Sequence, residues 1–262
     1  MRNALPSEWN LTLLGYWQLR RRGEPVEVSA RQQRVITVVA LLGSRSRRFV
    51  ANLLWPECSE LQAAGSLRAS VFRISHQLPL LMQSAGDPLT LDTHVAVDVH
   101  SVRQLIHEIV TIHDATGPTD PTDVLRSADL LPGWYEDWVI FEQERLQQQR
   151  LSALEALARR YLEAGDHDRS LNASSAAVAI EPLRESAQLL LVQGHLAAGN
   201  HASAAVVYQR LRASLHSEMG IAPSPRFAEL LESAVPLAVG GGASAPELQL
   251  RPALARRILS MN

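Results

Sequence analysis

The sequence predicts a mainly α-helical protein with small β elements, divided into two domains. In the first part of the chain a strand-rich segment precedes three helical patterns, and a hairpin composition follows the third of them. That order is typical of a winged helix-turn-helix. Further along, a six-residue pattern recurs at an offset of 34 residues, which is the tetratricopeptide period. We therefore expect an N-terminal winged helix-turn-helix domain followed by an all-α tetratricopeptide-like domain.

Two β-rich stretches are expected around the helices. Near the N-terminus, short apolar stretches, a turn composition at residues 20–25 and an alternation of valine with polar residues predict small strands. After the third helical pattern, residues 80–82 lead into a turn at 85–88, and residues 89–91 and Val95–Val97 return. A hairpin in this place would be the wing of a winged helix.

The first two helical patterns are separated by a cluster of arginines. Residues 31–42 place an apolar stripe on one face, and Gly43 ends that helix. Residues 50–55 predict a shorter helix that stops before Pro56, because the residue preceding a proline is pushed out of the α region. Trp55 is expected in the core. The predicted loop between the two helices carries three arginines, Arg45, Arg47 and Arg48.

The third pattern is the most informative, and it predicts a helix over residues 60–78. Leu67, Val71, Ile74 and Leu78 follow one another at i, i+4, i+7 and i+11, which places them on one face of an α-helix. The side chains assigned to the other face are Ser66, Arg68, Ser70, Arg73 and His76. A helix of this kind, set after a shorter helix and a turn, presents its polar face to a DNA major groove.

Downstream the pattern is helical almost throughout. Residues 162–167 (LEAGDH) recur as residues 196–201 (LAAGNH). In each copy a helix end is followed by a glycine suited to a left-handed C-terminal cap, and then by an Asp or Asn suited to start the next helix. Helix pairs stacked in this way bury a shared core and leave a surface for a partner. A Gly-rich stretch at residues 240–244 predicts a flexible linker.

These features divide the chain into three parts. We place the winged helix-turn-helix domain at residues 1–103, the helical domain at residues 104–235, and a flexible linker and tail at residues 236–262. Charge follows this division: residues 1–78 hold 11 Arg against 5 Glu, whereas the whole chain has a net charge of -2. A basic front and an acidic back indicate polyanion contact in the first part and protein contact in the second.

Nothing in the sequence supports an enzyme, a cofactor or a metal site. The chain has no lysine, which excludes a Walker A phosphate loop and Schiff-base chemistry. Its single cysteine, Cys58, gives no disulfide framework and no cysteine-rich metal site. His107 and His113 are six positions apart rather than the four of a zinc-protease helix. With no apolar run of about 18 residues and no signal peptide, we expect a soluble, cytoplasmic protein with no membrane partner.

These residues resemble the Streptomyces antibiotic regulatory protein family in its short form. In the front half the resemblance rests on the N-terminal strands, Leu54-Trp55-Pro56, and Ser66-Leu67-Arg68 with Val71 and Ile74. In the back half it rests on residues 130–138 (LLPGWYEDW), the 34-residue repeat, and residues 220–224 (GIAPS). The first set is similar to an OmpR-type winged helix, and the second to the bacterial transcriptional activator domain.

The resemblance implies a transcriptional activator that binds repeats upstream of a promoter and contacts RNA polymerase. The expected partners are double-stranded DNA and RNA polymerase, with a homodimer on the DNA as a further candidate. The family usually has Leu-Arg-Arg near the end of the recognition helix, whereas this chain has Ile74-Ser75-His76. Two positive charges of the family pattern are thereby replaced with a serine and a titratable histidine.

The sequence therefore gives a set of candidate DNA contacts, centred on Arg68 and Arg73. Arginine can bind guanine O6 and N7 or a phosphate; the alternative is a solvated helix face. The complete set of candidates is Arg45, Arg47, Arg48, Ser66, Arg68, Ala69, Ser70, Arg73 and His76. Trp134, Tyr135 and Trp138 are expected to pack the first helix of the second domain, with Trp134 and Trp138 on one helix face.

Two other functions compete with a DNA-binding activator. In the first, the chain is a protein–protein adaptor in which the helical repeats bind a partner and DNA binding is weakened. The Ser75-His76 departure from the family pattern is its support. In the second, the helical domain senses a small molecule, although no residues in the sequence are dedicated to a pocket.

Overall fold

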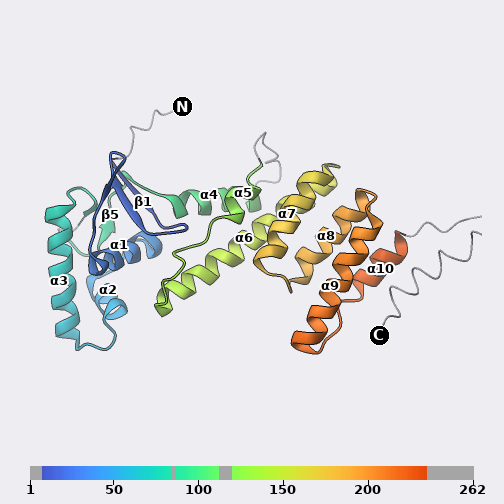
Figure 1. The fold of residues 1–262 in the computed structure, drawn as a ribbon. Coiled ribbons are helices and arrows are strands. Elements are labelled where there is room, and N and C mark those ends of the chain that lie inside the picture. Colours follow the sequence, from blue (N-terminus) through green and yellow to red (C-terminus); the bar gives the residue numbers. More distant parts are fainter. Residues whose placement is uncertain (1–7, 84–85, 112–119, 235–262) are drawn as a thin grey trace, which may run out of the picture. The chain divides into compact units, whose positions relative to one another are not determined.

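The computed structural model describes residues 8–83, 86–111 and 120–234 (Figure 1). The chain divides into two compact units. One consists of Met1–Glu108 with Ser127–Gln149, and the other of Ile109–Arg126 with Arg150–Asn262. The division does not follow the order of the chain, because residues 127–149 pack with the N-terminal part. The domain boundary at residue 103 remains a prediction, and the predicted linker and tail lie outside the described residues.

The first unit contains a four-stranded sheet in the order β3-β2-β1-β6. Strands β1 (Trp9–Thr12), β2 (Gln18–Arg21) and β3 (Glu24–Val26) are antiparallel neighbours. The turn predicted at residues 20–25 is present but shorter than the sequence suggests. Arg22 and Gly23, with φ of 51° and 92°, make a two-residue turn between β2 and β3, the tight geometry that suits the twist of a hairpin.

The wing is smaller than the sequence predicts. Strand β4 (Met82–Gln83) pairs antiparallel with β5 (Thr90–Leu91) and forms the two-stranded wing. Strand β6 (Val95–Val97) does not return to that hairpin; it lies parallel to β1, with Leu11 opposite Val97. Val95 and Val97 lie at alternate positions of β6, and both are buried. Pairing with β1 buries these side chains on the apolar side of the N-terminal sheet, which a two-stranded hairpin could not do.

Three helices complete the helix-turn-helix: α1 (Ala30–Leu42), α2 (Arg47–Leu54) and α3 (Glu60–Gln77). Both α1 and α2 pack against α3 (Figure 1). The expected positions of α1 and α3 are confirmed to within one residue at each end. The predicted start of α2 is wrong, because the helix begins at Arg47 rather than at residue 50. The hydroxyl of Ser46 accepts a hydrogen bond from Phe49 N and caps the added turn.

The core of the first unit is apolar and draws on the sheet and on each of the three helices. These side chains are at most 4% exposed: Trp9, Leu11, Leu13, Leu19, Val35, Ile36, Val38, Val39, Val50, Leu54, Leu67, Val71 and Ile74. Trp9 also donates its indole N–H to the carbonyl of Pro79, at 3.0 Å. That bond ties β1 to the chain just after α3, so the sheet helps to fix the end of this helix.

A single carboxylate joins β1 to the helix that follows β6. Helix α4 (Asp98–Thr111) begins at Asp98. The carboxylate of Asp98 accepts hydrogen bonds from the backbone N–H groups of Leu13 and Leu14, each at 3.0 Å, and of Val99 at 2.7 Å. Charge-assisted bonds of this kind are stronger than neutral ones, so Asp98 fixes where β1 ends and where α4 begins.

Residues 127–149 join the same unit through backbone pairing and a buried ion pair. Leu131 N donates to the carbonyl of Leu13, at 2.9 Å. Within α6 (Asp137–Glu163), Glu142 is 4% exposed and lies 2.6 Å from the guanidinium of Arg103 on α4. These contacts are why a segment more than 110 residues from the N-terminus belongs to the N-terminal unit.

The second unit consists of stacked helices. In addition to the C-terminal part of α6, it contains α5 (Thr122–Arg126), α7 (His167–Ile180), α8 (Glu185–Ala197), α9 (His201–Met219) and α10 (Arg226–Ser233). Helix α7 packs on α5 and α8, and α8 packs on α9 (Figure 1). No described helix in either unit is long and apolar enough to cross a membrane.

The 34-residue repeat is confirmed as a repeat of helix ends. Gly165 and Gly199 both have φ of 76°, the left-handed region where glycine carries no steric penalty. Asp166 and Asn200 are the N-cap residues of α7 and α9. Asp166 accepts a hydrogen bond from Arg169 N at 3.1 Å, whereas the side chain of Asn200 makes no capping bond. The two copies of the repeat therefore share the position and backbone conformation of the glycine, but only the first copy makes the capping bond.

Close approach and aromatic packing hold the stack together. A Cβ on Gly194 of α8 would lie 3.0 Å from the side chain of Leu171 on α7, so a glycine lets these two helices meet. Between α8, α9 and α10 the core contains Val192, Leu211 and the paired rings of Tyr208 and Phe227, whose centroids are 5.8 Å apart. Each helix alone has too narrow an apolar surface, and stacking provides the shared core.

A polar cluster fixes the start of the second unit. The carboxylate of Asp120 accepts hydrogen bonds from the backbone and hydroxyl of Thr122, at 3.0 and 2.6 Å, from Asn172 at 3.3 Å, and from Tyr161 at 3.4 Å. Partial burial raises the pKa of Asp120, but these hydrogen bonds outweigh it and hold the pKa below its usual value. Burial, together with the nearby Asp120 charge, raises the pKa of Tyr161.

Replacing Leu67 with alanine should destabilise the first unit. Leu67 is 1% exposed, and removing a buried leucine side chain typically lowers the free energy of unfolding by about 2 to 5 kcal/mol. Urea denaturation followed by circular dichroism measures this loss. Leu61→Ala is the matched control, because Leu61 lies on the same helix and is 79% exposed. A similar loss in both variants would contradict the assigned face of α3.

Asp120→Asn should make the stability of the protein less sensitive to acid. The pKa of Asp120 is lower in the folded state than in the unfolded state. Its contribution is therefore present above the unfolded pKa and is lost as the pH falls through the folded pKa. Urea unfolding between pH 7 and pH 3 should show a steeper loss in the wild type than in the variant. Asp168→Asn, at an exposed position of α7, should follow the wild type; parallel behaviour of all three proteins would refute the role of Asp120.

Candidate nucleic-acid interface

The helix-turn-helix is built by capping bonds at both of its helices. Ser59, the N-cap of α3, accepts a hydrogen bond from Gln62 N at 3.4 Å, and the Gln62 side chain accepts one from Ser59 N at 3.2 Å. This reciprocal arrangement is a capping box. Arg48 of α2 lies 2.8 Å from Glu60 of α3. The start of α3 is thereby held relative to α2.

The buried stripe of α3 determines which side chains face outward. Ala63, Leu67, Val71 and Ile74 are at most 4% exposed. Ser70 is also buried, at 1%, and its hydroxyl donates to the carbonyl of Ser66 at 2.9 Å. It lies three residues after Leu67 and four before Ile74, which places it on the inner side of the helix. Ser70 is therefore not on the exposed face, contrary to the prediction from the sequence.

The exposed face of α3 carries two arginines without a partner. Arg68 and Arg73 are exposed, and neither side chain has an ion pair or hydrogen bond with the residues that the structure describes. Ala69 and His76 are also exposed, and Ser66 is half-buried. The arrangement leaves a positively charged surface on a helix whose other side is fixed in the core.

Phe72 lies on the same face and was not identified from the sequence. Its side chain is 62% exposed, and its ring lies against the ring of His76 with centroids 4.0 Å apart. His76 Nδ1 is 2.8 Å from the carbonyl oxygen of Phe72. The spacing could have revealed it, because positions 68, 72 and 76 are separated by four residues and share one helix face.

The arginine cluster before α3 lies beside the wing rather than in a free loop. Arg45 exchanges backbone hydrogen bonds with Leu89, at 3.2 and 2.9 Å, and its guanidinium lies 5.7 Å from the centre of the Phe49 ring. Arg47 donates to the carbonyl of Gly86 at 3.1 Å, and Arg48 pairs with Glu60. Contrary to prediction, Arg47 and Arg48 lie in the first turn of α2, and all three side chains have partners within the protein.

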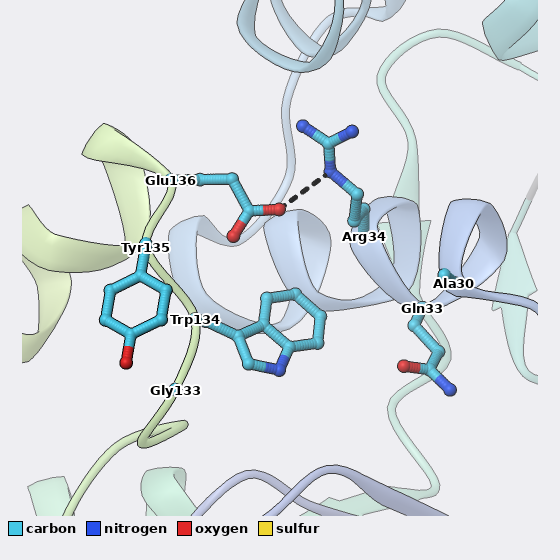
Figure 2. Close-up of a pocket in the computed structure, with 7 residues that line it drawn as sticks. All are labelled: Ala30, Gln33, Arg34, Gly133, Trp134, Tyr135 and Glu136. Carbon is cyan, nitrogen blue, oxygen red and sulfur yellow. Dashed lines mark ion pairs between the residues drawn. The ribbon is translucent and has the colours of Figure 1, made fainter.

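An open hollow of about 500 Å³ lies between α1 and the segment before α6 (Figure 2). It is lined by Ala30, Gln33, Arg34, Gly133, Trp134, Tyr135 and Glu136. The guanidinium of Arg34 is 3.0 Å from the carboxylate of Glu136. Because helix α6 begins at Asp137, Trp134 and Tyr135 precede it, and the predicted shared helix face of Trp134 and Trp138 is wrong.

The two charged residues that line the hollow pair with each other, and the ring of Tyr135 is 81% exposed. Within residues 8–83, 86–111 and 120–234, no group of three or more His, Cys, Asp or Glu side chains is placed to hold a metal ion. The exposed face of α3 is therefore the strongest candidate site in the first unit.

Comparisons with known proteins agree with this architecture. Residues 125–234 match the model of the bacterial transcriptional activator domain. The regulatory protein AfsR of Streptomyces coelicolor is 27% identical over 230 residues, and its counterpart in Streptomyces griseus is 27% identical over 243. The alignments cover 83% and 84% of this chain but only 23% and 24% of those proteins. The chain thus spans about a quarter of the length of these curated relatives.

A solved structure shows the same fold. Mycobacterium tuberculosis EmbR, in complex with a low-affinity phosphopeptide, superposes with a TM-score of 0.65 at 18% sequence identity. The superposition covers 87% of this chain and 65% of EmbR. Together, these findings describe a winged helix-turn-helix followed by a tetratricopeptide-like helical domain that matches the activator-domain model, an architecture similar to that of known regulatory proteins. The activator-domain match and the similarity to AfsR agree with the family resemblance seen in the sequence.

Removing the capping box of α3 should weaken this helix without changing its exposed face. Ser59→Ala should lower the free energy of unfolding by about 1 kcal/mol, because the first turn of the helix loses a side-chain acceptor. Thermal denaturation at fixed pH measures the effect. Ser75→Ala is the control, since Ser75 is exposed near the other end of α3 and bonds only within its own turn. Equal stability of Ser59→Ala and the wild type would show that the cap contributes nothing.

Proposed function

We propose that this protein binds double-stranded DNA through the exposed face of α3 and activates transcription from nearby promoters. The observation that carries the proposal is the pair of exposed arginines, Arg68 and Arg73, which have no partner among the described residues. They lie on a helix whose other face is anchored in the core. An arginine in such a place can bind guanine in two hydrogen bonds or can neutralise a phosphate.

The arginines next to the wing fit a second role, contact with the DNA backbone. Arg45 and Arg48 are exposed although their guanidinium groups have partners in the protein. Each guanidinium has five N–H donors, so a partner on one side leaves donors for a phosphate on another. We assign these side chains to phosphate contact and α3 to base contact, since phosphate contacts position a protein while base contacts select the sequence.

Activation itself is supported by the family match in the back half of the chain. Residues 125–234 match a domain described as a bacterial transcriptional activator domain. We infer that the chain binds repeated sites upstream of a promoter and contacts RNA polymerase, as the family resemblance implies. Binding to repeats would bring two copies of the chain together on the DNA. The adaptor function, by contrast, requires partner binding without specific DNA affinity.

Arg68→Ala and Arg73→Ala should each reduce affinity for specific DNA. The loss of a bidentate base contact costs about 1 to 3 kcal/mol, which is roughly 5- to 150-fold in the dissociation constant. The loss of a phosphate contact instead lowers the slope of log affinity against log salt by about 0.9. Gel-shift titrations at several salt concentrations, on a duplex selected from a random pool, distinguish the two cases.

The matched control is Arg20→Ala. Arg20 is an exposed arginine of β2, outside the helix-turn-helix, so this variant changes the net charge equally. It should bind DNA with nearly wild-type affinity. Unchanged affinity in both the Arg68 and Arg73 variants would refute the assigned face. Failure of the wild type to select any specific duplex would favour the adaptor function.

A further inference from the structure

The centre of the exposed face of α3 is apolar, although the residues around it are charged or polar. Phe72 lies four residues after Arg68 and four before His76, and it is 62% exposed. A single exposed aromatic side chain is common on protein surfaces and needs no special explanation. Its position between the side chains proposed to enter the groove is what gives it significance, because it would enter the groove with them.

The ring of Phe72 is held on one side. The ring of His76 lies 4.0 Å away, centroid to centroid, with an angle of 37° between the planes. His76 is itself tied to the helix, because its Nδ1 lies 2.8 Å from the carbonyl oxygen of Phe72 and a hydrogen on Nδ1 donates to that oxygen. Aromatic pairs in tilted or offset arrangements attract one another. The ring is thus supported before any ligand binds, and less conformational entropy is lost when it makes a contact.

The chemistry of this side chain narrows what it can recognise. Phenylalanine has no hydrogen-bond donor or acceptor, so it can bind neither a phosphate oxygen nor the polar edge of a base. In the major groove the apolar group that a base presents is the C5-methyl of thymine. We propose that Phe72 selects a thymine in the DNA site by packing its ring on that methyl group. This proposal rests on the proposed function.

The departure of this chain from the family pattern is consistent with such a role. Where the family usually has Leu-Arg-Arg, this chain has Ile74-Ser75-His76. Ile74 keeps its place in the core at 0% exposed, so the substitution changes the outward face alone. At position 76 this chain has a flat ring that lies against Phe72. The end of α3 therefore has less charge and more apolar surface.

Deoxyuridine substitution tests this contact, since deoxyuridine differs from thymidine only by the missing methyl group. The full chain is first used to select a tight duplex from a random pool, and each thymine of that duplex is then replaced in turn. At one thymine in each bound repeat, the wild type should lose about fourfold in affinity, which corresponds to ~0.8 kcal/mol for one buried methyl group. Phe72→Ala should bind the thymine and uracil duplexes equally at that position.

Two control variants separate this contact from general effects on binding. Phe141→Ala removes another exposed phenylalanine, which is 71% exposed and located on α6, and this variant should keep the fourfold preference. Arg68→Ala should lower affinity for both duplexes and also keep the preference. Because the change is made in the DNA, an altered stability of any variant cannot imitate the result.

The outcomes distinguish this proposal from the one on which it rests. A specific duplex in which every thymine can be replaced without loss would overturn the role of Phe72 and leave DNA binding intact. A preference that persists in Phe72→Ala would overturn it as well. Recovery of no specific duplex from the pool would overturn both proposals together.

Discussion

Burial of one stripe of α3 is the constraint on which the interface depends. Leu67, Val71 and Ile74 are at most 4% exposed and pack in the core beneath α1 and α2. Because side chains three and four residues apart share a helix face, this burial also determines which residues are exposed. It places Arg68 and Arg73 in solvent and removes Ser70 from the surface. Any tilt or rotation of α3 would therefore change the interface and the core together.

The distribution of ion pairs separates structural arginines from available ones. Arg103 pairs with the buried Glu142 at 2.6 Å, and Arg34 pairs with Glu136 at 3.0 Å. Both pairs connect segments that are distant in the sequence, and loss of Arg103 would leave the buried charge of Glu142 uncompensated. Arg68 and Arg73 connect nothing within the described part of the chain. Their side chains are exposed to solvent on the side of α3 that faces away from the core.

The family match and the compact units divide the chain differently. The match to the activator domain begins at residue 125, whereas residues 127–149 pack with the N-terminal unit. Asp98 and the pairing of Leu13 with Leu131 account for this, because they join β1 both to α4 and to the start of the matched region. The boundary predicted at residue 103 follows the order of the elements along the chain. The compact units instead depend on which segments form hydrogen bonds with one another.

The sequence by itself determined what depends on local periodicity. The apolar stripe of α3 and the repeated glycines at 165 and 199 follow from spacing alone, because helix geometry fixes which neighbours share a face or need a positive φ. The tertiary structure decided what depends on distant partners. Val95–Val97 pairs with β1 and not with the wing, and residues 127–149 pack in the first unit. Each of these outcomes depends on side-chain packing or pairing that periodicity in a sequence does not encode.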